Sequence, residues 1–252
     1  MNVRKTCFNF YWGIKKVIAP NLKYSQTIYE DVLQKNSLNK RYWLDLGCGH
    51  QLLPPWRLDQ ERELVKNAKV LVGLDYDLAA LKKHKTICCR VQGDILRLPF
   101  ADNFFDLVTS NMVFEHLRDP RNQLKEVNRI LKPGGTLIFH TPNVLSYSVL
   151  VARLIPEIVK NKAIHFLQDR GEEDIFPTYY RINSIKAIKD AAGLAGLELK
   201  KIKFIVSSPE LVMMPPLVVM ELVLIRILML KLCRPFRTNI IALLRKPSMN
   251  LN

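Results

Sequence analysis

The 252-residue chain holds five cysteines, and none of them stands in a Cys-x-x-Cys pair. An odd number of cysteines without metal-ligand spacing excludes a complete disulfide framework and disfavours a structural zinc site. The apolar stretch at residues 7–18 is interrupted by Asn9, Lys15 and Lys16, so it does not resemble a secretory leader. We therefore expect a cytoplasmic protein without a bound metal.

The chain also lacks the third glycine of a dinucleotide-binding fingerprint. A Gly-x-Gly-x-x-Gly pattern that starts at Gly47 would need a glycine at position 52, where the chain has Leu52, and Pro54 and Pro55 follow. That fingerprint lets a pyrophosphate sit on the N-terminus of the next helix. Its absence disfavours NAD and related dinucleotides as ligands.

Acidic residues are few at both ends of the chain. Residues 1–41 hold eight Lys or Arg against two Asp or Glu, and residues 181–252 hold twelve against four. The middle, residues 42–180, is nearly balanced at eighteen against seventeen, although the whole chain has a net charge of +15. Basic ends suit an anionic partner such as membrane lipid, an anionic substrate or nucleic acid. The alternative is a solvated basic surface without a partner.

An apolar run that ends in an acid and two glycines is the most informative motif that the chain does contain. Residues 43–50, Trp-Leu-Asp-Leu-Gly-Cys-Gly-His, predict a buried strand followed by a tight turn. Glycine suits such a turn because a residue without Cβ lets the backbone approach a ligand closely. A second apolar run ends at Asp75, and an acid at that place can accept hydrogen bonds from ribose hydroxyls.

Strands and helices alternate along the core, which predicts an α/β fold with a mostly parallel sheet. We expect helices near residues 59–67, 77–84, 118–131 and 183–196. The third of these should end at Lys132-Pro-Gly-Gly135, because proline fixes φ and cannot continue a helix.

This succession of motifs resembles the class I S-adenosylmethionine-dependent methyltransferases, closely over residues 38–143 and more loosely over 176–206. The motifs that carry the resemblance are Asp45-x-Gly-x-Gly49, the strand end at Asp75, Gly93-Asp-Ile95, Asp106-Leu-Val-x-Ser-Asn111 and Leu131-Lys-Pro-Gly-Gly135. Family members often carry a third glycine where this chain has Gln51. The resemblance implies a doubly wound, mostly parallel, seven-stranded Rossmann-like sheet, with S-adenosyl-L-methionine as the cofactor.

The resemblance also assigns the cofactor site residue by residue. It implies that the glycine turn holds the methionine part, that the end of the second strand binds the ribose, and that the third strand end meets the adenine. The residues in question are Asp45, Gly47, Cys48 and Gly49 in the turn, Asp75 and Tyr76, Asp94 and Ile95, and Asn111 under the methionine end.

Methyl transfer from a sulfonium is an in-line displacement, so the protein mainly aligns the acceptor with the methyl group. An oxygen or nitrogen acceptor also needs a general base, for which histidine is the natural candidate. His116 follows the fourth expected strand in a Glu-His-Leu sequence, and His140 ends the fifth. Both are candidate catalytic residues, although a structural or cofactor-contacting role fits His116 equally well.

We divide the chain into a helical arm at residues 1–37, a methyltransferase domain at 38–208 with a substrate-side insertion at 144–182, and an apolar, basic tail at 209–252. The uninterrupted helix of the tail, residues 217–232, contains Glu221, Arg226 and Lys231. It is shorter than the ~20 residues that a spanning helix needs. It therefore predicts a helix that lies in a membrane surface or packs on the domain, rather than a span.

We expect methyl transfer to a small-molecule, lipid-linked or glycan-linked acceptor, at oxygen, in the cytoplasm or peripherally at its membrane face. Ser110-Asn-Met112 stands where an Asn-Pro-Pro-aromatic motif would indicate methylation of exocyclic amines in nucleic acid. No aromatic-glycine signature of an RNA-binding module is present either. The alternatives are an RNA or protein methyltransferase whose basic ends hold the substrate, and a cofactor-binding partner protein without catalysis.

Overall fold

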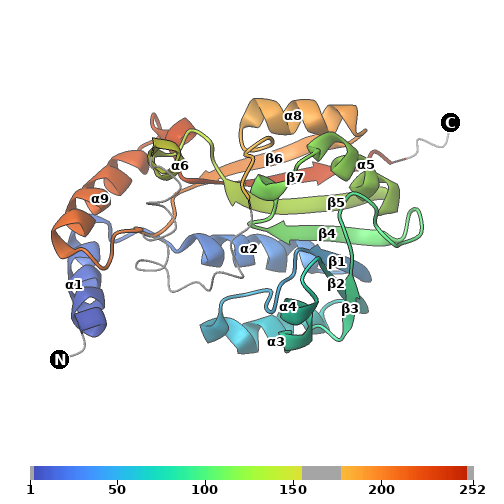
Figure 1. The fold of residues 1–252 in the computed structure, drawn as a ribbon, viewed down its shortest axis with the longest axis horizontal. Helices are drawn as coiled ribbons and strands as arrows, with labels where there is room; N and C mark the ends of the chain where they lie inside the picture. Colours follow the sequence, from blue (N-terminus) through green and yellow to red (C-terminus); the bar gives the residue numbers. More distant parts are fainter. Residues whose placement is uncertain (1–2, 155–176, 249–252) are drawn as a thin grey trace. The chain divides into compact units, whose positions relative to one another are not determined.

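The computed structural model describes residues 3–154 and 177–248 (Figure 1). The chain forms two compact units. We call the larger one the sheet unit and the smaller one the helical unit. The sheet unit comprises residues 26–142, 178–203 and 240–248, and the helical unit comprises residues 3–25, 143–154, 177 and 204–239. Most of the insertion predicted at residues 144–182 lies outside the described residues.

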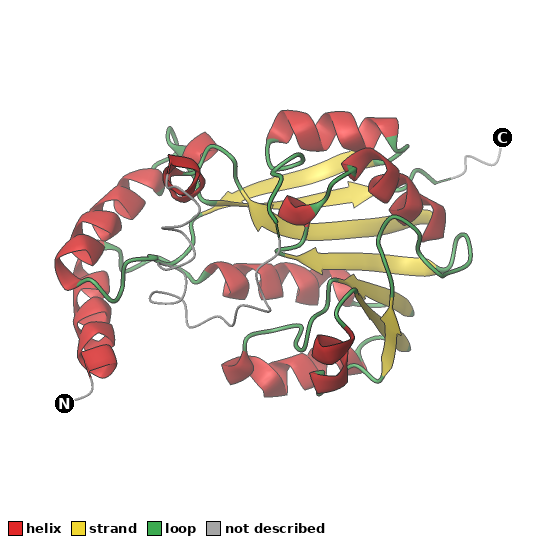
Figure 2. Cartoon of the chain, viewed as in Figure 1, coloured by secondary structure: helices red, strands yellow, loops and turns green. Residues whose placement is uncertain are grey.

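Seven strands form one sheet in the order β3-β2-β1-β4-β5-β7-β6 (Figure 2). In chain order they are β1 Tyr42–Leu46, β2 Val70–Asp75, β3 Cys89–Gln92, β4 Phe105–Asn111, β5 Leu131–Pro142, β6 Glu198–Ile205 and β7 Asn239–Arg245. Neighbours from β3 to β5 in this order are all parallel. The predicted seven-stranded, mostly parallel Rossmann-like sheet is therefore confirmed.

Strand β7 differs from the sequence analysis, which placed residues 239–245 in a C-terminal tail. The N–H of Gly134 donates to the carbonyl of Lys246 at 2.9 Å, and the N–H of Lys246 donates to the carbonyl of Gly135 at 2.9 Å. The start of β5 thus pairs with the end of β7, which makes these two strands antiparallel. The run Asn-Ile-Ile-Ala-Leu-Leu-Arg is an apolar stretch of strand length, and most of it is buried.

The four helices expected in the core are present, each within two residues of its predicted bounds. They are α3 Leu58–Lys66, α4 Leu78–Lys83, α5 Pro120–Ile130 and α8 Ile185–Leu194, and α2 Ser25–Ser37 precedes the first strand. Side-chain caps fix three of the starts, since Asp77, Asp119 and Ser184 each accept a hydrogen bond from a backbone N–H in the first turn of the following helix. Helix α5 ends at Ile130, two residues before the predicted stop at Lys132-Pro-Gly-Gly135.

The helical unit is built mainly from α1 Val3–Ile18 and α9 Pro215–Leu228, with the short α6 Tyr147–Leu154. Tyr11 of α1 and Val218, Leu222 and Ile225 of α9 belong to one buried apolar cluster. The predicted N-terminal helical arm and C-terminal apolar helix are therefore both present, and they pack on each other. Among the described residues, no helix combines the length and apolarity needed to cross a membrane.

Glu221 is a charged residue in the middle of the apolar helix α9, and it faces the interior of the helical unit. Its side chain accepts hydrogen bonds from the N–H groups of Glu210 and Leu211, each at 2.9 Å, and from the hydroxyl of Tyr147 at 2.7 Å. The residue is only 5% exposed. The carboxylate therefore joins α9 to the loop before it and to α6.

Replacing Glu221 by Ala should lower the free energy of unfolding by about 2–4 kcal/mol, because two backbone N–H groups and a hydroxyl lose their acceptor in a buried place. Urea denaturation followed by circular dichroism measures this loss. The matched control is Arg226→Ala on the same helix, whose side chain is exposed and which should change stability by less than about 0.5 kcal/mol. Equal stability of the two variants would contradict a structural role for Glu221.

Candidate active site

The turn after β1 holds two glycines with left-handed backbone conformations, at φ values of 65° for Gly47 and 53° for Gly49. The N–H groups of Gly47 and Cys48 donate to the carbonyl of Leu74 at the end of β2, at 2.7 and 3.2 Å. A Cβ on Gly47 would lie 2.3 Å from the side chain of Val113, whereas a Cβ on Gly49 would meet no atom within 4 Å. Gly47 is thus needed for packing, and Gly49 borders open space into which a ligand can come close.

Asp75 ends β2 and holds the turn from the other side. Its Oδ2 accepts a hydrogen bond from the N–H of Gly49 at 2.7 Å, and its Oδ1 accepts one from the N–H of Asp77 at 2.9 Å. A carboxylate offers about four acceptor positions. Because Asp75 is only partly buried, it retains capacity for the hydroxyl groups of a bound ribose.

Glu61 of α3 binds the backbone amides that follow the glycine turn. Its Oε2 accepts hydrogen bonds from the N–H groups of Leu52 and Leu53, at 3.1 and 2.8 Å, and its other oxygen accepts one from the hydroxyl of Thr86. The backbone amides that follow the turn are therefore already bound to a carboxylate of the protein itself. This contact supports the prediction that no pyrophosphate is held here, although no pattern in the sequence distinguishes Glu61 from a surface acid of the same helix.

Asp45 lies beneath the turn and is 3% exposed. Its Oδ1 accepts a hydrogen bond from the hydroxyl of Thr109 at 2.5 Å, and that hydroxyl accepts one from the indole Nε1 of Trp43 at 2.7 Å. Burial raises the pKa of Asp45 to about 7, and the hydrogen bond from Thr109 opposes this rise. A cationic group bound at the turn would favour the charged form of this carboxylate.

The other predicted cofactor residues lie at the same edge of the sheet, because parallel strands bring their carboxyl ends together. Tyr76 follows β2 and is 73% exposed, and Asp94 and Ile95 follow β3. The Oδ1 of Asp94 accepts a hydrogen bond from the N–H of Leu96 at 2.9 Å. The thiol of Cys48 points into the protein, where it donates to the carbonyl of Gly49 at 3.8 Å, and burial raises its pKa well above the ordinary value.

Asn111 and His140 are paired across β4 and β5. The side-chain Nδ2 of Asn111 donates to Gln26 at 2.9 Å, and its Oδ1 lies 2.8 Å from Nδ1 of His140. The His140 ring is fully buried, stacks on Tyr29, and has a pKa that burial lowers to about 3. These contacts suit a neutral ring that positions Asn111, so its assignment as a general base stays a prediction.

His116 is the more accessible of the two candidate bases, with 29% of its side chain exposed. It lies in the 3₁₀ turn η2 Phe114–His116, and its Nε2 is 3.9 Å from Oε1 of the buried Glu115. Val113 directly precedes η2, and its side chain lies beside Gly47 of the glycine turn. His116 is therefore three residues along the chain from a residue that contacts the glycine turn.

A buried chain of hydrogen bonds holds Glu115 in place. The hydroxyl of Thr141 donates to Oε2 of Glu115 at 3.0 Å, and Nδ2 of Asn183 donates to the Thr141 hydroxyl at 2.7 Å. All three residues are nearly or fully inaccessible to solvent. Sequence analysis did not identify Thr141 or Asn183, because they lie far from Glu115 along the chain and belong to no motif.

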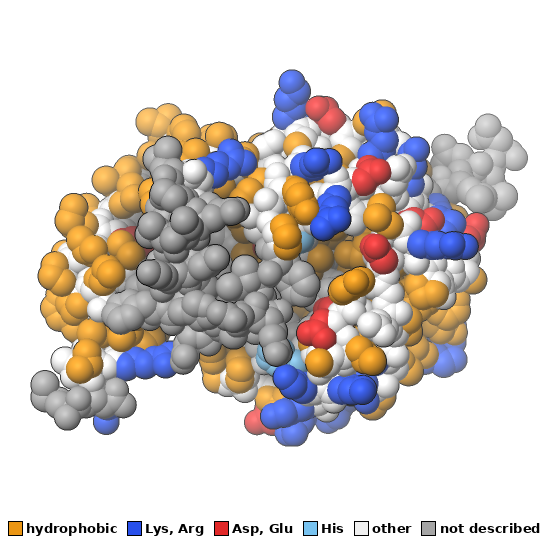
Figure 3. Space-filling view, viewed as in Figure 1, with side chains coloured by type: hydrophobic (Ala, Val, Ile, Leu, Met, Phe, Trp, Pro, Cys, Tyr) orange, Lys and Arg blue, Asp and Glu red, His pale blue; other side chains and the backbone are white. Residues whose placement is uncertain are grey.

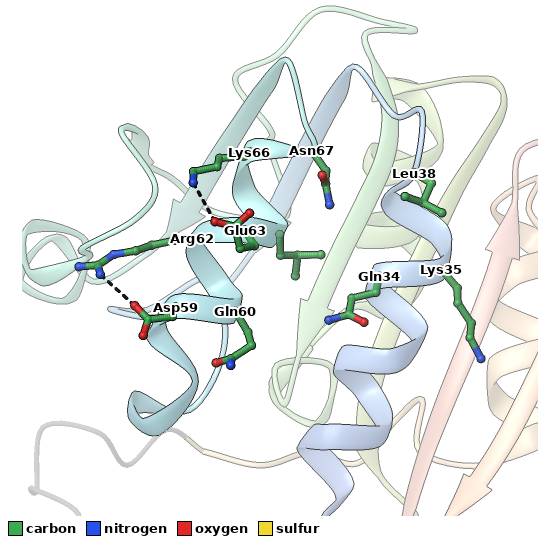
Figure 4. A pocket seen from close by; sticks show the side chains of 10 residues that line it. Gln34, Lys35, Leu38, Asp59, Gln60, Arg62, Glu63, Lys66 and Asn67 are labelled. Atoms are coloured by element: carbon green, nitrogen blue, oxygen red, sulfur yellow. Dashed lines mark hydrogen bonds and ion pairs between the residues drawn. The ribbon is translucent and has the colours of Figure 1, made fainter.

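An open groove between α2 and α3 does not coincide with this site (Figure 4). Its lining is mixed in charge, and the pairs Asp59–Arg62 and Glu63–Lys66 are ion pairs within α3. None of the predicted cofactor or catalytic residues lines it.

Comparison with known proteins connects this geometry to a family. Residues 44–139 match the family model described as a methyltransferase domain. The chain is 33% identical over 137 residues to a demethylmenaquinone methyltransferase of Mycobacterium marinum, covering 53% of this chain and 57% of that protein. It is 42% identical over 72 residues to malonyl-[acyl-carrier protein] O-methyltransferase 1 of Coxiella burnetii, covering 29% and 25%. The chain thus matches between a quarter and little more than half of the length of these relatives.

Solved structures agree on the fold. An S-adenosylmethionine-dependent methyltransferase of Mesorhizobium loti aligns with a TM-score of 0.52 at 16% identity, over 86% of this chain and 96% of that one. A methyltransferase of the same kind from Methanosarcina mazei aligns with a TM-score of 0.55 at 16% identity, over 85% and 96%. Together with the matched domain over residues 44–139, they show that the chain contains a methyltransferase domain with the fold of the S-adenosylmethionine-dependent methyltransferases.

Proposed function

We propose that the protein transfers the methyl group of S-adenosyl-L-methionine to an oxygen of a small-molecule or lipid-linked acceptor. The observation that carries this proposal is the turn at Gly49, which is open to a ligand and is held by the carboxylate of Asp75. A turn of this kind fits a cofactor without phosphates, because the amides of Leu52 and Leu53 are bound to Glu61.

S-adenosylmethionine supplies a methyl group on a sulfonium, which is a good leaving group. The protein's own part is to bind and align. Asp75 would accept hydrogen bonds from the ribose hydroxyls, Asp94 and Ile95 would meet the adenine, and the turn at Gly47 and Gly49 would hold the methionine end. Alignment of the acceptor oxygen is then the largest contribution that the chain can make to the rate.

His116 is the residue that we assign as general base. The proton leaves the acceptor oxygen for the His116 ring, and the adjacent Glu115 carboxylate stabilises the imidazolium that forms. Thr141 and Asn183 act through Glu115 and are positioning residues. The demethylmenaquinone methyltransferase and the malonyl-[acyl-carrier protein] O-methyltransferase among the relatives support an acceptor that is a small molecule or is carried on a larger group.

We also propose that the helical unit attaches the protein peripherally to an anionic membrane surface at the cytoplasmic face. Large apolar side chains are exposed along helices α1 and α9. Figure 3 shows hydrophobic side chains crowded over these two helices. The exposed apolar residues of these helices and of the segment after α9 include Phe10, Trp12, Val17, Met220, Val223, Ile227, Leu230 and Leu232.

The basic residues of the helical unit favour binding to an anionic membrane surface. Helix α1 contains Arg4, Lys5, Lys15 and Lys16 and no acid, and the single acid of α9, Glu221, is buried. Apolar side chains that enter the headgroup region, flanked by basic residues, are typical of helices that lie in the membrane plane. This surface includes α1 as well as the C-terminal apolar helix, and both belong to the basic ends that the sequence analysis relates to an anionic partner such as membrane lipid.

Replacing Asp75 by Ala should weaken S-adenosylmethionine binding at least ~10-fold, because paired hydrogen bonds to ribose hydroxyls are worth roughly 1–3 kcal/mol. Calorimetric titration measures the affinity, with NAD as a ligand that should not bind. Asp77→Ala is the matched control, since it removes a neighbouring carboxylate that caps α4 and should leave the affinity unchanged. Equal affinities of wild type and Asp75→Ala would refute the ribose assignment.

His116→Ala should lower kcat by about 10²–10⁴-fold without changing the affinity for S-adenosylmethionine, because only proton removal is lost. S-adenosylhomocysteine release is measured with the hydroxyl-bearing acceptors of a total lipid extract, because a carboxylate acceptor holds no proton that a base must remove. Added imidazole should restore part of the rate to His116→Ala but not to His140→Ala, whose ring is buried. Rescue of His140→Ala alone would transfer the base assignment to His140.

The protein should sediment with vesicles of phosphatidylcholine and phosphatidylserine, and less with phosphatidylcholine alone or at high salt. Trp12→Ser should weaken this binding about tenfold, since an apolar ring leaves the interface. Trp56→Ser is the matched control, because Trp56 is 70% exposed but belongs to the sheet unit. The membrane proposal would be refuted if binding were the same with and without phosphatidylserine and the same for the wild type and Trp12→Ser.

A further inference from the structure

Two arginines of the sheet unit lie against the same tyrosine ring. The guanidinium carbon of Arg118 is 5.6 Å from the centroid of Tyr179, and that of Arg181 is 5.7 Å from it. Arg118 precedes α5, and Tyr179 and Arg181 lie in the segment before α8. We call these three residues the arginine–tyrosine cluster.

Backbone hydrogen bonds fix the two segments that carry the cluster. The N–H groups of Tyr179 and Tyr180 both donate to the carbonyl of Glu115, at 2.7 and 3.1 Å. Nη1 of Arg181 donates to the carbonyl of Arg118 at 2.5 Å. Tyr180 adopts a left-handed φ of 51°, which a residue with a side chain adopts only where surrounding contacts impose it. The cluster is therefore a built arrangement and not a meeting of two loose surface side chains.

Within residues 3–154 and 177–248, no carboxylate neutralises the charges of the cluster. Both arginines are exposed, and in the described part of the chain neither guanidinium forms an ion pair with a carboxylate. The adjacent acid, Asp119, instead accepts hydrogen bonds from the backbone and side chain of Asn122 at the start of α5. Two like charges near one ring repel each other, and a bound anion would remove that repulsion.

The position of the cluster relates it to the proposed active site. Arg118 lies two residues after His116, and the carbonyl that holds Tyr179 and Tyr180 belongs to Glu115, whose carboxylate is 3.9 Å from the His116 ring. The cluster therefore shares its supporting segment, residues 115–118, with His116. The planar fork of a guanidinium matches the two oxygens of a carboxylate or phosphate.

We propose that Arg118 and Arg181 bind an anionic group, a carboxylate or a phosphate, of the methyl acceptor. This inference rests on the proposed methyl transfer and names the chemical class of its acceptor. Tyr179 holds the two guanidinium groups by contact with its ring, and the anion gives the acceptor its orientation toward His116.

Anion binding is tested directly by NMR on the full chain, without any turnover. Inorganic phosphate and malonate are titrated against the side-chain Nε–H signals of Arg118 and Arg181, with sodium chloride at matched ionic strength as the reference. Both signals should shift on addition of at least one probe, and Arg118→Gln or Arg181→Gln should weaken that binding at least ~10-fold. Arg118→Lys keeps the charge but loses the fork, so it should also bind more weakly.

The matched control is Arg121→Gln, which removes an exposed arginine from the first turn of α5 and should leave probe binding unchanged. A shift that chloride reproduces, or equal binding by the wild type and the Arg118 and Arg181 variants, would overturn the proposal. A preference for malonate or for phosphate identifies which anion the acceptor carries.

Turnover separates this proposal from the proposed function. S-adenosylhomocysteine release is compared for pairs of acceptors that differ only in the anionic group. One pair is an acid and its amide, and the other is a phosphate ester and its alcohol. The wild type should prefer an anionic member at least ~10-fold in kcat/KM, and the double variant Arg118→Gln/Arg181→Gln should lose that preference through KM. Methylation without such a preference overturns the anion site and leaves the proposed function standing. Failure to bind S-adenosylmethionine refutes the proposed function, and the NMR titration still decides the anion site.

Discussion

The conformation of the turn after β1 depends on carboxylates that accept hydrogen bonds from its backbone amides. Asp75 binds the N–H of Gly49, and Glu61 binds the N–H groups of Leu52 and Leu53. A glycine in a left-handed conformation has many alternatives in an unfolded chain, so the turn keeps one shape only while these acceptors are in place. The spacing between β1, α3 and the end of β2 follows from them.

Buried carboxylates with donors from distant segments recur in both units. Glu115 joins the end of β4 to β5 and to the segment before α8, and Glu221 joins α9 to α6 and to the loop before α9. A buried charge is costly unless hydrogen bonds satisfy it: Glu221 accepts three, and Glu115 accepts one from Thr141, whose hydroxyl in turn accepts one from Asn183. Hydrogen bonds to carboxylates thus fix the turn after β1, the segment that carries His116 and the orientation of helix α9.

The sequence predicts those site residues that lie in a strand or in the turn that directly follows it. Asp45, Gly47, Gly49 and Asp75 follow directly after apolar runs, and parallel pairing then brings their strand ends to one edge. Glu61, Thr141 and Asn183 could not be predicted, because their partners lie 8 to 42 residues away along the chain and only the folded sheet brings them together. Strand β7 was missed for a related reason, since its antiparallel partner β5 lies about a hundred residues earlier and the basic, apolar surroundings indicate a tail.

The three hydrogen bonds to Glu221 also determine how α9 is turned about its own axis. Rotating the helix would take the carboxylate away from the N–H groups of Glu210 and Leu211 and from the Tyr147 hydroxyl, and would carry the charge toward apolar surroundings. Met220, Val223 and Ile227 are therefore held in a constant outward direction. An apolar surface that meets this helix encounters a face that is already oriented, so little conformational entropy remains to be lost on contact.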